Sequence, residues 1–67
     1  MDINKTIGEK VRTIRTKKGI SQDELAEKSS LTRPHISMIE RGSVSLQIDT
    51  LQKIADALGV QIKELLE

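Results

Sequence analysis

Apolar residues recur at spacings of three and four positions along this chain, which is the repeat of a helix that buries one face. The first such stripe comprises Ile3, Ile7, Val11 and Ile14. Gly19 follows as the expected terminator, so a helix is predicted over roughly residues 3–18. Because the chain contains no Phe, Tyr or Trp, its core must be built from Ile, Leu, Val and Ala. Aromatic stacking on single-stranded bases is therefore excluded.

A capping box marks the start of a second helix. Ser21 and Glu24 match the S-x-x-E pattern, in which each side chain accepts a hydrogen bond from the other residue's backbone amide. This helix is predicted to end near Lys28. The turn Ser29-Ser30-Leu31 follows, with its leucine directed into the core.

A third helix is predicted from the residues that follow this turn. Thr32 suits the N-cap position, and Pro34 lies in the first turn, where its missing N–H costs no intrahelical hydrogen bond. Arg41-Gly42 ends the helix, because glycine readily adopts the left-handed conformation that follows a last turn.

Two further helices complete the pattern. Apolar residues form one stripe over about residues 48–58, and Gly59 terminates it. Gln47 is a poor N-cap, so either Ser45 caps this helix or the helix begins later. The short last helix carries more apolar surface than a small core requires, which indicates a partner surface. Its apolar residues are Val60, Ile62, Leu65 and Leu66.

The predicted fold class is therefore all-α, a compact five-helix bundle. It forms a single domain over residues 1–67, with a helix-turn-helix unit at about residues 21–41 that fits the major groove of DNA. A chain of 67 residues buries only about 60% of its unfolded surface, so modest stability is expected unless it associates.

Charge is distributed unevenly along the chain, although the net charge is only +1. Residues 1–18 hold six basic and two acidic residues, whereas residues 43–67 hold two basic and four acidic ones. A basic end favours nucleic acid as a partner. The alternative is that the first helix simply has a solvated charged face.

Composition excludes several functions. The chain has no Cys and a single His, so disulfides, a metal site and a metal-containing cofactor are not expected. Scattered carboxylates and the lack of a glycine-rich phosphate loop argue against an enzyme. No apolar run approaches a membrane span and no signal peptide precedes the first helix, so the cytoplasm is the expected location. Met1 is expected to be the natural start, whereas Glu67 is either the natural end or a truncation point.

Several blocks of sequence, in a fixed order, carry a family resemblance. They are Ile7-Gly8-Glu9-Lys10-Val11-Arg12, Ser21-Gln22-x-x-Leu25-Ala26, Ile36-Ser37-x-Ile39-Glu40-Arg41-Gly42 and Thr50-Leu51-x-x-Ile54-Ala55-x-Ala57-Leu58-Gly59-Val60. Together they resemble the helix-turn-helix domain of phage repressors and Cro proteins, the Xre family, over nearly the whole chain. The resemblance implies a repressor-like five-helix bundle that binds operator DNA, usually as a two-fold dimer.

The chain departs from the family pattern at two places. Ser30 stands where the family often has Gly, so it must adopt the turn at a cost of about 1 kcal/mol. Leu46-Gln47 stands where relatives often carry a Pro and then a capping Ser or Thr.

The third helix offers candidate base-reading residues if it enters the major groove. Ile36 and Ile39 face the core, and the helical period then places the opposite set outward. That set is Arg33, Pro34, Ser37 and Met38. The Arg33 guanidinium can donate two hydrogen bonds to O6 and N7 of guanine, and the other three can bond to or pack on base edges. Alternatively, Arg33 binds only a phosphate, and Pro34 is purely structural.

A second set is predicted to contact DNA phosphates. Gln22 resembles the family's backbone-clamping glutamine, at a helix start whose free amides favour an anion. Ser43 and Ser45 fall where the family touches the next phosphates, and Arg41 and Thr32 join them, although cap and turn roles also explain Thr32 and the serines. His35 either reaches a phosphate or is a partly exposed spacer, which is favoured.

The resemblance also aligns Arg15 and Glu40 with an ion pair between the first and third helices, which would orient them. The alternative is that these are exposed side chains that never meet.

Two functions remain open, because the chain lacks the set of residues that an enzyme would need. The first is a sequence-specific, double-stranded DNA-binding transcriptional regulator, a homodimer on an inverted repeat with half-sites about 10 base pairs apart. Its variants are a phage-type repressor, a restriction-modification controller, an antitoxin or the DNA-binding domain of a longer repressor. The second is a protein-interaction adaptor that uses the apolar face of the last helix. The residues Ile62, Leu65 and Leu66 would form the dimer interface in the first case and the adaptor surface in the second.

Overall fold

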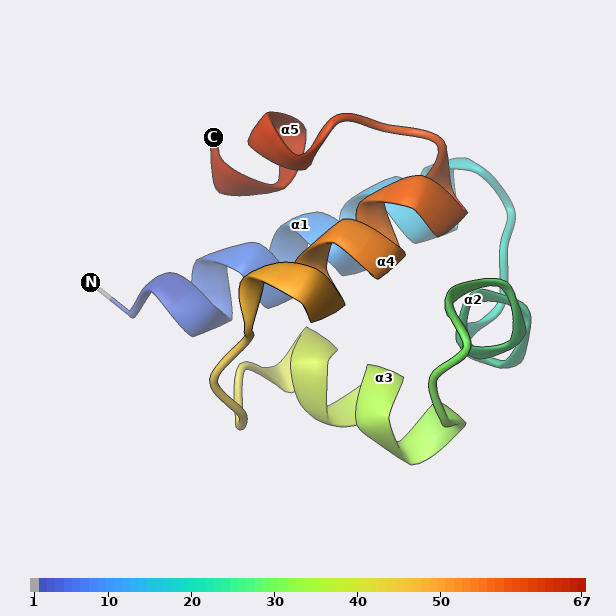
Figure 1. Cartoon of the computed structure of the whole chain (residues 1–67), viewed down its shortest axis with the longest axis horizontal. Coiled ribbons are helices and arrows are strands. Elements are labelled where there is room, and N and C mark those ends of the chain that lie inside the picture. The colour runs from blue at the N-terminus through green and yellow to red at the C-terminus, as the bar shows by residue number, and fades with distance from the viewer. Residues whose placement is uncertain (1) are drawn as a thin grey trace.

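Five helices make up the described part of the chain, residues 2–67, in this computed structural model (Figure 1). They are α1 (Ile3–Lys17), α2 (Gln22–Ser29), α3 (Arg33–Arg41), α4 (Ile48–Leu58) and α5 (Ile62–Leu66). No strand occurs in residues 2–67, and the predicted all-α, five-helix fold is confirmed.

The N-cap side chains of α1, α2 and α3 accept hydrogen bonds from the first turn of their helices. The Asp2 carboxylate accepts hydrogen bonds from two backbone amides at the start of α1. Ser21 and Glu24 form the predicted capping box of α2, and the Thr32 hydroxyl caps α3. Gln47 precedes α4 without a side-chain cap, so the alternative in which Ser45 caps this helix is wrong.

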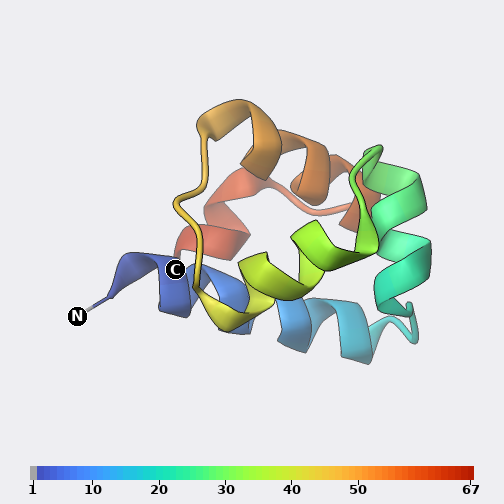
Figure 2. The same ribbon diagram turned by 90° about the horizontal axis from the view of Figure 1, so that it is seen from below.

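The helices pack as a layered bundle around an aliphatic core. In Figure 1, α4 crosses in front of α1, α3 lies below them and α5 above, and Figure 2 shows α2 closing the end of the bundle away from the two termini. Helix α1 contacts α3, α4 and α5, and α2 contacts α3 and α4. The core consists of Ile7, Val11, Leu25, Ala26, Ile36, Ile39, Leu51, Ile54, Ala55, Leu58 and Leu65. It is built from Ile, Leu, Val and Ala, as predicted.

Packing corrects three details of the sequence prediction. Ile3 is exposed, because the first turn of α1 extends beyond the layer of helices that covers the rest of its stripe. Ser29 belongs to α2 rather than to the turn, where its buried hydroxyl donates a 2.6 Å hydrogen bond to the Leu25 carbonyl. Leu65 was predicted to lie in an interface with a partner, but it is fully buried in the core and cannot contact one.

The turn between α2 and α3 is closed by a residue in the left-handed conformation. Ser30 has φ of 60°, and it is the one non-glycine residue in the described chain with a positive φ. This is the position where the resemblance expected glycine. An L-residue pays about 1 kcal/mol there, which the surrounding packing must offset.

Helices α1 and α3 pack tightly against each other at Gly8. A β-carbon built on Gly8 would lie 2.3 Å from the Ile39 carbonyl oxygen and 2.8 Å from the Glu40 carbonyl oxygen. Both are backbone atoms, so a side chain could be accommodated only by moving a whole helix. Gly8 therefore sets the distance at which α3 lies against α1.

Candidate nucleic-acid interface

Helix α3 has one buried face and one open face. Ile36, Ile39 and Glu40 are buried against the rest of the bundle. Of the predicted base-reading residues, Arg33 and Pro34 are exposed, and Ser37 and Met38 are half-buried. The helical period thus places all four away from the core face, and what they contact in a complex remains a prediction.

A pocket on the surface joins the start of α3 to the start of α2. Its volume is about 280 Å³, and its lining residues are Gln22, Arg33, Pro34 and Ser37. Three of these were predicted to read bases and the fourth to clamp a phosphate. Met38 is not among the lining residues, and it lies one turn of the helix beyond Pro34.

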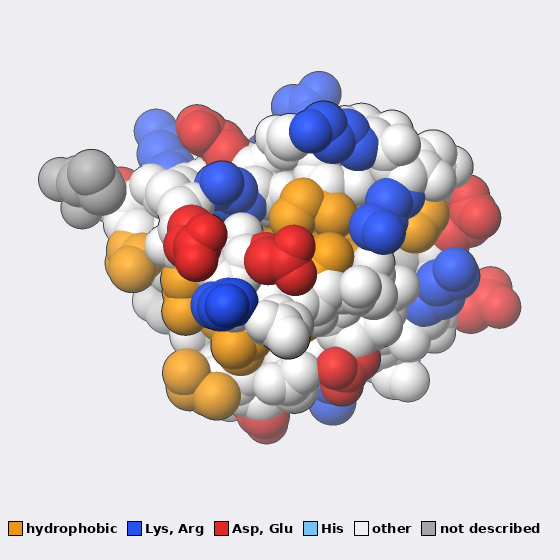
Figure 3. Space-filling model, turned by 90° about the horizontal axis from the view of Figure 1, so that it is seen from above, with side chains coloured by type: hydrophobic (Ala, Val, Ile, Leu, Met, Phe, Trp, Pro, Cys, Tyr) orange, Lys and Arg blue, Asp and Glu red, His pale blue; other side chains and the backbone are white. Residues whose placement is uncertain are grey.

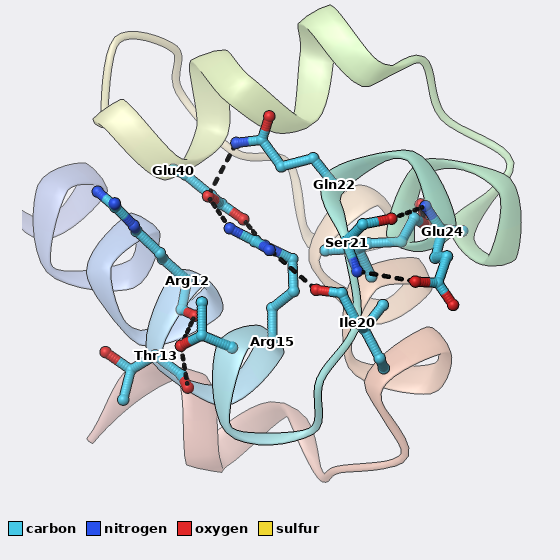
Figure 4. A network of polar contacts seen from close by, with 11 residues as sticks. Arg12, Thr13, Arg15, Ile20, Ser21, Gln22, Glu24 and Glu40 are labelled. Carbon is cyan, nitrogen blue, oxygen red and sulfur yellow. Dashed lines mark hydrogen bonds and ion pairs between the residues drawn. The ribbon is translucent and has the colours of Figure 1, made fainter.

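Arg15 and Glu40 form the ion pair that the resemblance expected between α1 and α3. Arg15 Nε donates to Glu40 Oε2 at 2.6 Å, and a second guanidinium nitrogen donates to Oε1 at 3.1 Å (Figure 4). The remaining guanidinium nitrogen donates to the Ile20 carbonyl at 2.9 Å. The side chains are 11% and 4% exposed, so the pair is largely removed from water.

The same carboxylate also holds Gln22. Gln22 Nε2 donates to Glu40 Oε1 at 3.1 Å, so one carboxylate connects α1, the start of α2 and α3 (Figure 4). No buried side-chain nitrogen or oxygen in the described chain lacks a hydrogen-bond partner. This network fixes the end of the pocket that Gln22 forms.

The other residues predicted to contact phosphates lie at the start of α3, at its end and in the loop that follows it. The Thr32 hydroxyl accepts the His35 amide at 3.2 Å, and the Ser43 hydroxyl donates to the Met38 carbonyl at 3.1 Å. Thr32 therefore retains a donor hydrogen, and Ser43 retains acceptor lone pairs. Arg41 and Ser45 are exposed, and His35 is half-buried, as its role of partly exposed spacer requires. Their contacts with phosphates remain predictions.

One contact at the pocket has no signal in the sequence. Arg33 Nε lies 3.6 Å from Asp23 Oδ1, across the turn between α2 and α3. The two residues are ten positions apart and share no helix, so neither helical spacing nor a motif pairs them. The hydrogen bond from Gln22 to Glu40 was missed for the same reason.

The capping box links the stability of α2 to pH through the Glu24 carboxylate. The hydrogen bond from the Ser21 amide, together with that of the Ser21 hydroxyl, holds the pKa of Glu24 below its ordinary value. The unfolded carboxyl therefore takes up its proton at a higher pH than the folded one. This contribution to stability is present above the ordinary pKa and is lost as the pH falls through the lowered one.

Glu24→Gln is accordingly expected to flatten the acid limb of the stability profile, since glutamine keeps a hydrogen-bond acceptor but does not titrate. Urea unfolding of both proteins between about pH 3 and pH 7 measures the effect. The wild-type chain should lose more stability than the variant below about pH 4.5. Parallel profiles would contradict this role for Glu24.

Residues 2–67 also lack the features of two other classes of protein. No group of His, Cys, Asp and Glu there is arranged to hold a metal ion. No helix there combines the length and apolarity that crossing a bilayer demands.

Helices α2 and α3 are short and are joined by a tight turn. The inner face of α3 packs on the bundle and its outer face is accessible to solvent, which is the arrangement of a helix-turn-helix domain. Comparison with known proteins gives the family. Residues 11–65 match the family described as helix-turn-helix. Control protein C.BamHI of Bacillus amyloliquefaciens is 46% identical over 67 residues, covering 98% of this chain and 83% of that protein.

Solved structures agree with this match. The restriction-modification controller protein C.AhdI from Aeromonas hydrophila has a TM-score of 0.90 at 35% identity, over 92% of this chain and 94% of that chain. The hypothetical transcription factor NHTF from Neisseria has a TM-score of 0.93 at 35% identity, over 98% of this chain and 76% of that chain. The chain belongs to the helix-turn-helix family of transcriptional regulators, which are DNA-binding proteins rather than enzymes. The expected resemblance is confirmed.

Proposed function

We propose that this regulator binds a specific double-stranded DNA operator as a homodimer, with one α3 in each of two successive major grooves. The observation that carries the proposal is the outer face of α3, which opens onto a pocket lined by Gln22, Arg33, Pro34 and Ser37. An α-helix fits the major groove, where each base pair presents a distinct pattern of donors and acceptors. The proposal places the protein in the cytoplasm, with its DNA.

We propose a role for each of the predicted site residues. Arg33 reads guanine, and Pro34, Ser37 and Met38 contact neighbouring base edges. The residues proposed to hold phosphates are Gln22, Thr32, Arg41, Ser43 and Ser45. Phosphate contacts set the position of the protein and base contacts set its sequence preference, so the two groups predict different mutational effects.

The exposed residues of α5 support a dimer, although they are fewer than the three residues predicted from the sequence. Leu66 is 49% exposed and Ile62 is half-buried, whereas Leu65 is buried in the core of its own chain. Figure 3 shows hydrophobic side chains emerging between charged ones on the face that carries α5. We therefore propose Ile62 and Leu66 for the interface between two copies.

The physiological role that we propose is control of a restriction-modification operon. C.BamHI bears the name control protein, and its match extends over nearly all of this chain and most of that protein. C.AhdI carries the description restriction-modification controller protein, and it is similar to this chain over more than nine-tenths of both.

Selection of bound duplexes from a randomised DNA pool, at low and at moderate salt, tests the proposed function. We expect a two-fold symmetric motif with half-sites about one helical turn apart. Binding without any motif, which disappears at moderate salt, would leave only nonspecific electrostatics. That result would favour the adaptor function, in which the exposed part of α5 binds another protein.

Substitutions at the pocket should separate base reading from phosphate contact. Arg33→Ala is expected to remove about 1–3 kcal/mol of discrimination at the guanine position. Gln22→Ala should instead weaken binding to all duplexes alike, since its proposed contact with DNA is to a phosphate. Titrations of the selected site and of single-base variants, at one fixed salt concentration, measure both effects. A uniform loss for Arg33→Ala and a base-specific loss for Gln22→Ala would reverse the proposed roles.

A further inference from the structure

The contact between Asp23 and Arg33 brings a carboxylate to the edge of the base-reading pocket. Arg33 Nε lies 3.6 Å from Asp23 Oδ1, and the two side chains are 64% and 76% exposed. Arg33 lines the pocket beside Gln22. Asp23 directly follows Gln22 at the start of α2, so the carboxylate that contacts the proposed base reader belongs to the residue next to the proposed phosphate clamp.

The chemistry of guanidinium makes the position of this contact informative. A guanidinium has five N–H donors in a fixed plane, and it can present either the edge with Nε or the edge with the two terminal NH2 groups. The carboxylate faces Nε. The edge with the two terminal groups is thereby left to meet the O6 and N7 atoms of guanine.

We propose that Asp23 is a specificity-determining residue that acts through Arg33, holding its guanidinium so that the terminal NH2 edge points at guanine. The inference rests on the proposed function, because it assumes that Arg33 reads a base. Asp23 itself touches no base in this proposal. It narrows the orientations of a long, exposed side chain, which would otherwise lose more conformational entropy on binding.

The role of Asp23 in orienting Arg33 and the repulsion between its charge and DNA predict different changes in binding. An exposed ion pair is weak in free protein, but the pair loses water when DNA covers it. Asp23 also brings a negative charge close to the phosphates, which disfavours every duplex equally. Removing that charge should therefore strengthen binding to unrelated DNA while it weakens the preference for guanine.

The experiment compares Asp23→Asn with Glu27→Gln, which removes the same charge from an exposed position one turn further along α2. Each protein is titrated with the selected operator, with operators changed at the guanine, and with an unrelated duplex. For Asp23→Asn we expect discrimination to fall about three- to fivefold, the upper range for an exposed ion pair. Both variants should bind the unrelated duplex more tightly than wild type does, and Glu27→Gln should keep full discrimination.

A third variant tests whether Asp23 acts on discrimination through Arg33. On an Arg33→Ala background, Asp23→Asn should cause no additional loss of discrimination, because the side chain that it orients is gone. Unchanged discrimination for Asp23→Asn alone, or an equal loss with and without Arg33, would overturn the inference and leave the proposed function intact. Failure of the wild-type protein to select any motif would overturn both.

Discussion

Gly8→Ala is expected to lower the free energy of unfolding by about 3 kcal/mol, which is a large share of the stability of a chain this small. The added β-carbon would lie 2.3 Å from the Ile39 carbonyl oxygen, so α1 and α3 must separate. The sign of the change is diagnostic, because alanine is a better helix former than glycine by about 1 kcal/mol. A neutral or stabilising result would show that the two helices adjust without cost.

Gly19→Ala is the matched control for this substitution. Among the described residues, nothing lies within 4 Å of a β-carbon built on Gly19, although its φ is +69°. We expect a loss of about 1 kcal/mol from the backbone alone. Urea unfolding followed by far-ultraviolet circular dichroism suits both variants, because the chain has no aromatic residue to report on folding by fluorescence.

Glu40→Ala should be the second severe substitution, with a loss of about 3–5 kcal/mol. It removes the acceptor of three hydrogen bonds and leaves the Arg15 guanidinium largely buried without its partner. A lone buried charge is far more costly than the intact pair is stabilising. Arg15→Ala should therefore be severe for the same reason.

A double-mutant cycle tests whether the cost comes from the pair. When both side chains are replaced by alanine, no uncompensated charge remains, so the double variant should lose much less than the sum of the single losses. Additive losses in urea unfolding would instead mean that each side chain contributes only through its own packing. Glu40→Gln, which keeps the shape but not the charge, should fall between wild type and Glu40→Ala.

Local signals explain why the helices of this chain could be predicted from its sequence. Caps such as Ser21 and Thr32 act within one turn, and apolar spacing reports which face is buried. The prediction failed where packing against other helices decides. Adjacent residues Leu65 and Leu66 are equally apolar, yet one is fully buried and the other is half exposed.

The candidate site divides in the same way. The helical period of α3 was sufficient to separate Arg33 and Ser37 from the core face. The hydrogen bond from Gln22 to Glu40 and the contact between Asp23 and Arg33 depend on how α2 and α3 meet across a turn. Such contacts depend on the relative placement of two helices, which no pattern within either helix reports.

The two faces of α3 have a consequence for how proteins of this kind change their targets. Ile36, Ile39 and Glu40 hold α3 against the bundle through its inner face. The proposed base-reading residues lie on the other face and are not among these buried residues. Substitutions on the outer face can therefore accumulate without eroding the bundle that carries them. A lineage with such a helix can acquire a new operator in small steps, each of which leaves a folded protein for selection to act on.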